Sequence, residues 1–242
     1  MVRMLRRVMR ATPSNPRCKV CFSPFGGFGG RVVRFAGFAR SRKNPNFCDA
    51  CFEKAPHGGV ESYVGVLFAD IRGFTTMSEG MPPDAAAALL NRFYATVTDV
   101  LIRFDGLVDK LVGDEAMGLF LPYFVEDYIS AMALAAEDLL RRVGYARAGH
   151  PWCPVGIGLA AGVAFVGNVG AGDVKDFTAI GDVVNTASRL QAQARAGQIV
   201  MTDAVYEVMR DRWPEAPAVA LQLKGKTEPV AVHVVDVVSA VG

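Results

Sequence analysis

The chain has 242 residues, 51% of them hydrophobic and 21% charged, which suits an ordinary globular protein with one full domain and a small accessory unit. Its longest weakly polar run, residues 155–166, is shorter than the roughly 18 to 20 residues that span a bilayer. The run also contains three glycines, which excludes a membrane helix there. The net charge of +2 combines +11 in residues 1–47, which hold no acidic side chain, with −9 in the remaining 195 residues.

The basic N-terminal segment suggests a contact with the acidic remainder of the chain, with an acidic partner or with an anionic surface. A solvated basic tail is the alternative. We expect no nucleic acid as a partner. The first ten residues are basic but contain no long apolar run, so they do not resemble a secretory signal, and a cytoplasmic location is the default expectation.

Four of the five cysteines form two pairs, Cys18-x2-Cys21 and Cys48-x2-Cys51, separated by 26 residues. Four thiolates in this pattern suit a tetrahedral Zn²⁺ ion. An iron–sulfur cluster uses the same ligands, and two disulfides are disfavoured in a cytoplasmic protein. We therefore expect residues 1–60 to form a small basic, zinc-ribbon-like module with a structural metal.

Beyond residue 60, apolar strand-like runs alternate with amphipathic helices, and turn residues separate them. The first expected elements are a buried strand at 63–70, a helix that starts at 82–84 and ends at Gly106, two strands within 107–121 and a helix at about 125–146. We then expect strands at 154–162 and 163–170 joined by a turn, a short strand at 176–181 and a helix at 182–195 that Asp182 caps. The last expected elements are a strand at 198–202, a helix at 203–212, and strands at 219–225 and 230–237. This pattern predicts a mixed α/β domain without an internal repeat.

Two acidic residues stand where strands end. Asp70 closes the 63–70 strand, and Asp114 lies in the turn between the two strands of 107–121. If these strands are neighbours, the two carboxylates share one crevice, and they need a cation between them. Oxygen ligands suit Mg²⁺ or Mn²⁺, and backbone N–H groups of the turn at 71–75 offer a cradle for phosphate. The alternative is that Asp70 is a helix cap and Asp114 an ordinary turn residue.

The segments "FADIRGFT", "DKLVGDEAMGLF" and "FTAIGDVVNTASRL" together resemble the class III nucleotide cyclases, the family of adenylyl and guanylyl cyclase catalytic domains. The resemblance covers roughly residues 61–236 and implies that residues 61–242 form the catalytic domain. It also implies an α+β sandwich of the ferredoxin-like, palm-like kind.

The resemblance implies a role for each matching position. Those that would bind metal are Asp70, Ile71 and Asp114. Those that would read the base are Lys110 and Thr178, where many members carry aspartate in place of the threonine. Those that would orient the ribose and stabilise the transition state are Asn185 and Arg189. Those that would bind phosphate are Gly73, Phe74, Thr75 and Lys224.

Elementary chemistry is consistent with these roles. Asn185 and Arg189 are four residues apart and share one helix face, where a planar guanidinium can bind developing phosphate charge. Lys110 lies in an apolar segment and needs an acceptor, which an adenine ring nitrogen would provide. The alternatives are a solvated helix face for the first pair and an edge-strand lysine in water for Lys110.

The implied reaction is intramolecular phosphoryl transfer in ATP: the 3′-oxygen attacks the α-phosphorus, pyrophosphate leaves, and two metal ions assist. In this family, one subunit supplies the metal-binding aspartates and the phosphate loop, and the other supplies the base-reading, ribose and transition-state residues. A chain with both sets can form a symmetric homodimer with two complete sites.

Leu159 and Ala160 depart from the family pattern, where many members carry a histidine and a threonine, and we expect only a packing effect. Thr178 leaves room for GTP, although a guanine reader would be expected to carry an acidic residue at Lys110. A diguanylate cyclase is disfavoured because Val112 and Ala116 break that family's signature hairpin. A catalytically inactive cyclase-homology module is the remaining alternative.

Overall fold

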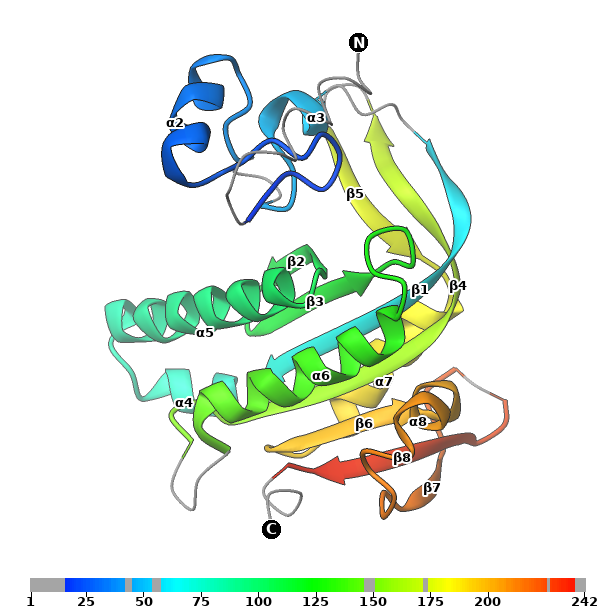
Figure 1. Ribbon diagram of the computed structural model, residues 1–242. Helices are drawn as coiled ribbons and strands as arrows, with labels where there is room; N and C mark the ends of the chain where they lie inside the picture. The colour runs from blue at the N-terminus through cyan, green and yellow to red at the C-terminus, as the bar shows by residue number, and fades with distance from the viewer. Residues whose placement is uncertain are drawn as a thin grey trace. The chain divides into compact units, whose positions relative to one another are not determined.

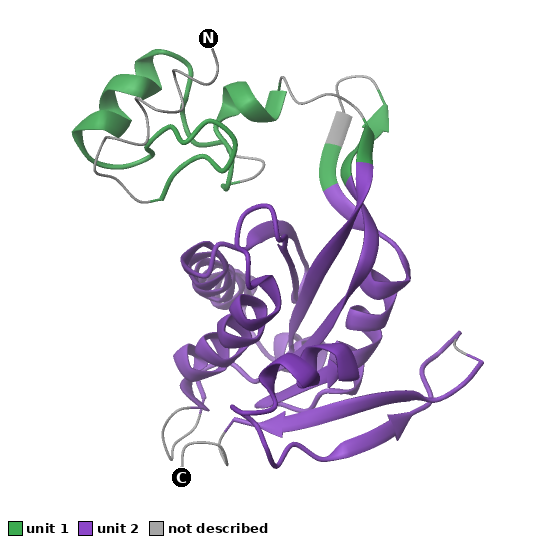
Figure 2. Cartoon of the chain, turned by 45° about the vertical axis from the view of Figure 1, so that its right-hand side comes forward, with its two compact units in different colours: residues 1–59, 167–177 green, residues 60–166, 178–242 purple. Residues whose placement is uncertain are grey.

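The computed structural model describes residues 16–41, 45–53, 58–145, 151–171, 174–225 and 227–237. By its internal contacts the chain divides into two units, residues 1–59 with 167–177, and residues 60–166 with 178–242 (Figure 2). The expected functional division near residue 60 stays a prediction.

The larger unit is built on one mixed sheet with the strand order β2-β3-β1-β4-β6-β8-β7, and β5 pairs with β4 (Figure 1). The strands are β1 (Gly58–Ile71), β2 (Leu107–Val112), β3 (Glu115–Phe120), β4 (Val155–Ala171), β5 (Val174–Ile180), β6 (Gln198–Thr202), β7 (Ala218–Leu221) and β8 (Val230–Asp236). The helices are α4 (Phe74–Glu79), α5 (Pro83–Arg103), α6 (Tyr128–Leu140), α7 (Asp182–Gln193) and α8 (Asp203–Met209), and the short π-helical segment η1 (Arg141–Tyr145) directly follows α6. The β-α-β-β-α-β run from β1 to β4 is ferredoxin-like, which confirms the expected fold class.

Helices cover both faces of this sheet, as the alternation of apolar side chains along β6 requires. Ile199 and Met201 point into the main core, which includes residues of α5, α6 and α8, whereas Val200 packs with Leu190 of α7. Figure 1 shows α5 and α6 on the near face and α7 behind the sheet. Helix α7 is thereby held against the strands that lead to the candidate site.

Helix α5 buries the apolar stripe expected from its four-residue periodicity. Phe93, Val97 and Leu101 are fully buried, and Leu89 is partly exposed. Within the part of the chain that the structure describes, α5 is the one helix whose length and composition would suit a membrane span. It contacts β2, β3 and α6, which are the contacts of a core helix.

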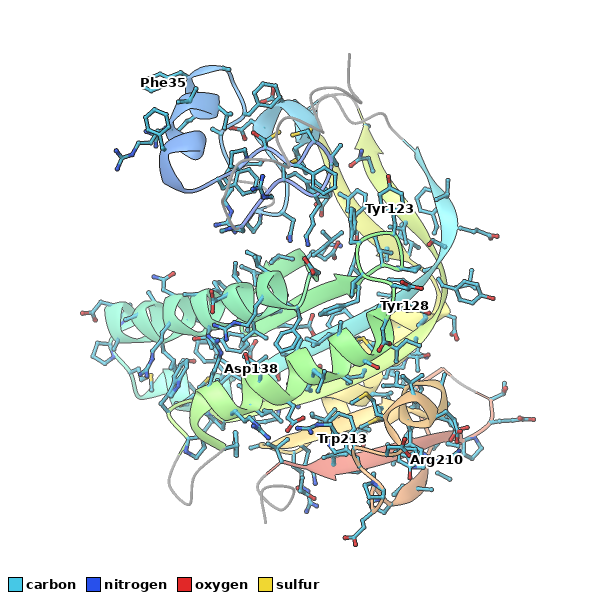
Figure 3. All side chains as sticks on the ribbon, in the orientation of Figure 1. Phe35, Tyr123, Tyr128, Asp138, Arg210 and Trp213 are labelled. Atoms are coloured by element: carbon cyan, nitrogen blue, oxygen red, sulfur yellow. The ribbon has the colours of Figure 1, made fainter. Side chains whose placement is uncertain are left out.

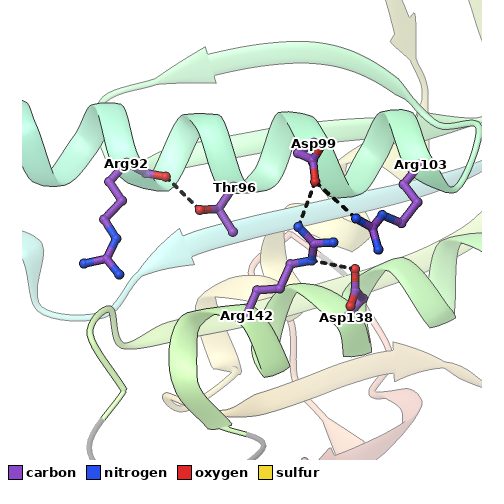
Figure 4. A network of polar contacts seen from close by, with 6 residues as sticks. All are labelled: Arg92, Thr96, Asp99, Arg103, Asp138 and Arg142. Carbon is purple, nitrogen blue, oxygen red and sulfur yellow. Dashed lines mark hydrogen bonds and ion pairs between the residues drawn. The ribbon is translucent and has the colours of Figure 1, made fainter. Parts of the chain in front are cut away.

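A network of charged side chains joins α5 to the end of α6 (Figure 4). The Arg142 guanidinium donates to Asp99 at 2.7 Å and to Asp138 at 2.9 Å, while Arg103 lies 3.7 Å from Asp99. Because these groups are partly exposed, we expect a stabilisation of at most about 1 kcal/mol per pair.

The expectation of two strands and a turn within 154–170 is wrong, because β4 is one continuous strand over Val155–Ala171. Its glycines allow other backbone segments to approach closely. A Cβ atom on Gly158 would lie 2.2 Å from the Gln191 nitrogen and 2.3 Å from the Ala187 carbonyl oxygen. Gly158 therefore permits α7 to pack directly on the sheet.

Replacing Gly158 by alanine should displace α7. We expect the free energy of unfolding to fall by about 1 to 3 kcal/mol, the usual cost of overpacking, and activity to fall because α7 carries Asn185 and Arg189. Gly162→Ala is the matched control, since its Cβ would meet only the Val183 side chain at 3.4 Å. Thermal melting measures the difference, and equal melting temperatures for the two variants would contradict the packing argument.

Several element ends also differ from the expectations. Helix α7 is capped by Gly181, and Asp182 is its first residue, so the expected Asp182 cap is wrong. Helix α6 begins after Asp127, whose side chain accepts a hydrogen bond from the Ser130 N–H. Helix α8 ends at Met209, and the residues after it form turns around the buried Trp213.

The smaller unit contains α2 (Gly27–Phe35) and α3 (Asp49–Glu53). Helix α2 was not expected from the sequence. Three of its nine residues are glycines, and glycine disfavours helix formation. Gly30 faces inward, where a Cβ would lie 2.7 Å from the Phe25 carbonyl carbon. On the other side of the helix, Phe28 is 84% exposed, and Phe35, which Figure 3 labels, is 89% exposed.

Candidate active site

The end of β1 and the β2–β3 turn bring the two predicted metal-binding aspartates to one edge of the sheet. Asp70 lies opposite Glu115 in the β1–β3 register. The Ile71 N–H donates to the Asp114 carbonyl oxygen at 3.1 Å. The two strands are therefore neighbours, as the sequence analysis required for the carboxylates to share a crevice.

Three acidic residues, Asp70, Asp114 and Glu115, lie at this strand end. Burial, with Asp114 alongside, raises the pKa of Glu115. Arg72 forms an ion pair with Asp70, and its guanidinium also approaches the Gln191 carbonyl oxygen at 3.4 Å. Carboxylates with the Ile71 carbonyl form an oxygen donor set that fits Mg²⁺ or Mn²⁺. Sequence reasoning missed Arg72, which connects Asp70 to the C-terminal end of α7.

The predicted phosphate loop follows directly. Gly73 has φ 70°, a left-handed conformation that glycine adopts without strain. It precedes α4, so the N–H groups of Phe74 and Thr75 lie in the first turn, where they have no partner within the helix. Thr75 is exposed and Phe74 is partly buried.

Lys110 and Thr178, which are 68 residues apart, are in direct contact. The Lys110 Nζ donates to the Thr178 Oγ1 at 2.9 Å. Lys110 lies on the edge strand β2 with 44% of its side chain exposed, and Thr178 on β5 is buried. The Thr178 hydroxyl also contacts the Asp109 carboxylate at 3.1 Å. Asp109 is a site neighbour that sequence reasoning missed.

Helix α7 carries two further predicted site residues, Asn185 and Arg189. Asn185 is exposed and Arg189 is partly buried one turn later. The Arg189 Nη2 lies 3.2 Å from the place where a Cβ on Gly225 would be. Arg189 therefore packs against the loop that holds Lys224, which is itself exposed.

Within this unit, the predicted residues form three groups: Asp70 with Asp114 at a strand end, Lys110 with Thr178 between β2 and β5, and Arg189 with the Lys224 loop. A hydroxyl on α5 supports the first group, since Tyr94 donates to the Gly113 carbonyl oxygen of the β2–β3 turn.

In the smaller unit, the four cysteines converge. Their sulfur atoms all lie within 4.8 Å of one another. The Cys21 and Cys48 sulfurs are 3.7 Å apart, and the Cys48 N–H donates to the Cys18 sulfur at 3.3 Å. Contacts with Cys21 and the other thiols hold the pKa of Cys18 far below its usual range, and contacts with Cys18 raise that of Cys48. The cluster can hold a metal ion.

The fifth cysteine differs from these four. Cys153 is fully buried in the larger unit, and burial raises the pKa of its thiol to about 12. A free cysteine in such a position behaves as a small packed apolar residue.

The larger unit thus combines a mixed sheet, acidic residues at one strand end and a contact between Lys110 and Thr178. Residues 59–236 match the family model described as "Adenylate and Guanylate cyclase catalytic domain". The chain belongs to this family, which confirms the resemblance, and it carries a nucleotide cyclase catalytic domain.

Similar proteins include both substrate classes. The adenylyl cyclase CyaB from P. aeruginosa is 28% identical with a TM-score of 0.64, over 73% of this chain and 95% of that one. The guanylyl cyclase Cya2 is 27% identical with a TM-score of 0.65, over 73% and 92%. An uncharacterized protein of Mycobacterium tuberculosis is 36% identical over 189 residues, 74% of this chain and 33% of that protein. The chain thus spans about a third of the length of the curated relative.

Proposed function

We propose that the protein is an adenylate cyclase that converts ATP to 3′,5′-cyclic AMP and pyrophosphate at a homodimer interface. The observation that carries the choice of ATP is the contact of Lys110 with Thr178. A lysine can only donate hydrogen bonds, and adenine N1 can only accept them, whereas guanine N1 carries a hydrogen. With Lys110 at N1 and Thr178 as the acceptor for the 6-amino group, the pair matches adenine, whereas guanine in the same placement would set its N1 hydrogen against Lys110.

The metal-binding residues are Asp70, Asp114 and the carbonyl of Ile71, which would hold two Mg²⁺ or Mn²⁺ ions. Such ions, when bound, lower the pKa of the 3′-hydroxyl and neutralise phosphate charge. The assignment is supported by the pairing of Asp70 with Glu115 and by the hydrogen bond from the Ile71 N–H to the Asp114 carbonyl oxygen, which bring these acidic residues to the same strand end.

The remaining residues position the nucleotide. Lys110 and Thr178 hold the base, and the loop Gly73-Phe74-Thr75 and Lys224 bind the triphosphate. Asn185 orients the ribose so that the 3′-oxygen faces the α-phosphorus. A bond forms between these atoms as the bond to the pyrophosphate oxygen breaks, and Arg189 stabilises the charge that develops on the transferring and leaving groups.

A homodimer would bring the two halves of each site together, with Asp70 and Asp114 from one subunit and Lys110, Asn185 and Arg189 from the other. Two-fold symmetry then creates two identical sites. The presence of both sets of matching residues in one chain supports this arrangement, because each subunit can then supply both halves.

A competition assay tests the base assignment. With equal concentrations of ATP and GTP and Mn²⁺ present, cyclic AMP should be the main product. Predominant cyclic GMP would favour the second candidate function, a guanylate cyclase. The similarity to the guanylyl cyclase Cya2 supports that alternative.

We also propose that Cys18, Cys21, Cys48 and Cys51 bind one structural Zn²⁺. Zn–S bonds of about 2.3 Å in a tetrahedron place sulfurs about 3.8 Å apart, close to the 3.7 Å between Cys21 and Cys48. An iron–sulfur cluster distributes its four thiolates over two or more irons, so some of its sulfurs would lie farther apart than the 4.8 Å within which all four sulfurs lie here. Phe47, which precedes Cys48, packs edge-on against Phe177, with 5.5 Å between the ring centroids. Phe177 precedes Thr178 in the sequence.

Purified under reducing conditions, the protein should contain about one zinc ion per chain. The double variant Cys18→Ser, Cys48→Ser should lose the zinc and melt at a lower temperature, because four-thiolate sites contribute to folding. Cys153→Ala is the control and should retain the metal. Elemental analysis that finds neither zinc nor iron would contradict the site, and iron with visible absorption would favour the cluster.

The N-terminal segment is proposed to contact an acidic partner or an anionic surface. Residues 16–41 carry five basic and no acidic side chains, which supports such a contact. A cytoplasmic location and a role for cyclic AMP in signal transduction complete the proposal.

A further inference from the structure

Strand β2 contains a bulge at Asp109. In the β2–β3 register, Val108 lies opposite Gly118 and Lys110 lies opposite Met117. Asp109 is thus an extra residue with no counterpart on β3. Adjacent side chains of a regular strand point to opposite faces, but a bulge can redirect one of them. This explains how two consecutive residues, Asp109 and Lys110, both reach Thr178.

The three side chains form a closed triangle. The Lys110 Nζ lies 2.9 Å from the Thr178 Oγ1 and 3.4 Å from the Asp109 Oδ2. The Thr178 Oγ1 lies 3.1 Å from the same Asp109 oxygen. The Asp109 side chain has no exposed surface, whereas 44% of the Lys110 side chain is exposed. Asp109 therefore lies beneath the pair and cannot itself be the group that solvent or a ligand meets first.

The chemistry of the three groups determines the direction of each hydrogen bond. An ammonium can only donate, and a carboxylate can only accept. The Thr178 hydroxyl has one hydrogen, and its possible acceptors are the Asp109 carboxylate at 3.1 Å and the Ala179 carbonyl oxygen at 3.5 Å. The shorter, charge-assisted bond is the stronger one. The hydroxyl hydrogen is therefore directed at Asp109, and Thr178 presents lone pairs elsewhere.

We propose that Asp109 is a positioning residue for base selection, which fixes Thr178 as a hydrogen-bond acceptor and keeps Lys110 beside it as a donor. This inference rests on the proposed cyclase function. The adenine edge offers a 6-amino donor and an N1 acceptor, which match Thr178 and Lys110. The guanine edge offers an O6 acceptor and an N1–H donor, the reverse pattern. Asp109 would thus favour ATP over GTP without touching either.

The test compares selectivity, (kcat/KM for ATP)/(kcat/KM for GTP), in the wild type and in Asp109→Asn. The amide preserves shape but can donate or accept, so it frees the Thr178 hydroxyl to donate to guanine O6. We expect selectivity to fall about tenfold, the lower range for one base-reading hydrogen-bond arrangement. Both rates come from one preparation, so a partly unfolded fraction cancels in the ratio. Asp105→Asn, an exposed change before the same strand, should keep the wild-type ratio.

A second background shows whether Asp109 acts through Thr178. In Thr178→Val, which has no hydroxyl, adding Asp109→Asn should change the selectivity less than in the wild-type background, because only the contact of Asp109 with Lys110 is then affected. A wild-type ratio in Asp109→Asn, or an equal change in both backgrounds, would overturn the inference. If Asp109→Asn is inactive with both nucleotides, the ratio of ATP to GTP affinities by displacement of a fluorescent nucleotide replaces the kinetic ratio. If the wild type itself produces no cyclic nucleotide, the proposed function fails, and the same binding ratios still decide the role of Asp109.

Discussion

Asp70→Ala and Asp114→Ala should each abolish cyclic nucleotide formation while the protein stays folded. Each change removes a proposed metal ligand, and the loss of several kcal/mol of transition-state stabilisation corresponds to a roughly thousandfold or larger fall in kcat/KM. Asp114→Ala relieves repulsion with Glu115, whose pKa is raised by burial and by Asp114, so its melting temperature should change little. Asp70→Ala also removes the ion-pair partner of Arg72, so a modest fall in its melting temperature is expected while the protein stays folded.

The matched control for this experiment is Glu207→Ala, which removes an exposed carboxylate paired with Arg210 on the surface. It should keep near wild-type activity. If either aspartate variant retains more than about a hundredth of the wild-type rate, the metal assignment fails, because no other part of the proposal could replace a lost ligand.

Mixing two inactive variants should restore activity. Asp70→Ala and Arg189→Ala are each expected to be inactive as homodimers, because every site contains one lesion. In a heterodimer, one site contains both lesions and the other contains neither. With free subunit exchange, half of the dimers are mixed, so about a quarter of the wild-type activity should return.

Subunit exchange needs independent proof, for which two different affinity tags on the variants suffice. If tagged heterodimers form and activity stays at background, the site is not shared between subunits. A mixture of Asp70→Ala with Asp114→Ala is the negative control, because both lesions lie in the same half of the site and no heterodimer contains an intact one.

The metal-binding edge could be predicted from local sequence. A buried strand that ends in Asp70 and a tight turn at Asp114 lie within 45 residues and obey simple rules for strands and turns. Their adjacency then required only that the two strands pair, and the β1–β3 register confirms it.

The contacts made by the base-reading residues could not be derived in the same way. Lys110 and Thr178 are far apart in sequence, and only the family resemblance connected them. The regular alternation of a strand would place Asp109 and Lys110 on opposite faces. The bulge that brings them together depends on pairing with β3, which the sequence of β2 alone does not reveal.

Glycines caused the main errors of secondary structure. In β4 they were interpreted as a turn, although Gly158 serves the close approach of α7. In α2 they concealed a helix whose packing against Phe25 requires a residue without a side chain at Gly30. In both places the reason for glycine lies in a neighbouring segment, so local propensity indicated the wrong element.

The most direct test of the whole account is to identify the product formed from ATP. The 242-residue chain is incubated with ATP and Mn²⁺ beside the Asp114→Ala variant, and nucleotides are analysed by mass spectrometry. The account predicts cyclic AMP with an equal amount of pyrophosphate, and none above background from the variant. A folded, ATP-binding protein that forms cyclic nucleotide from neither ATP nor GTP would contradict it and identify the domain as a catalytically inactive module.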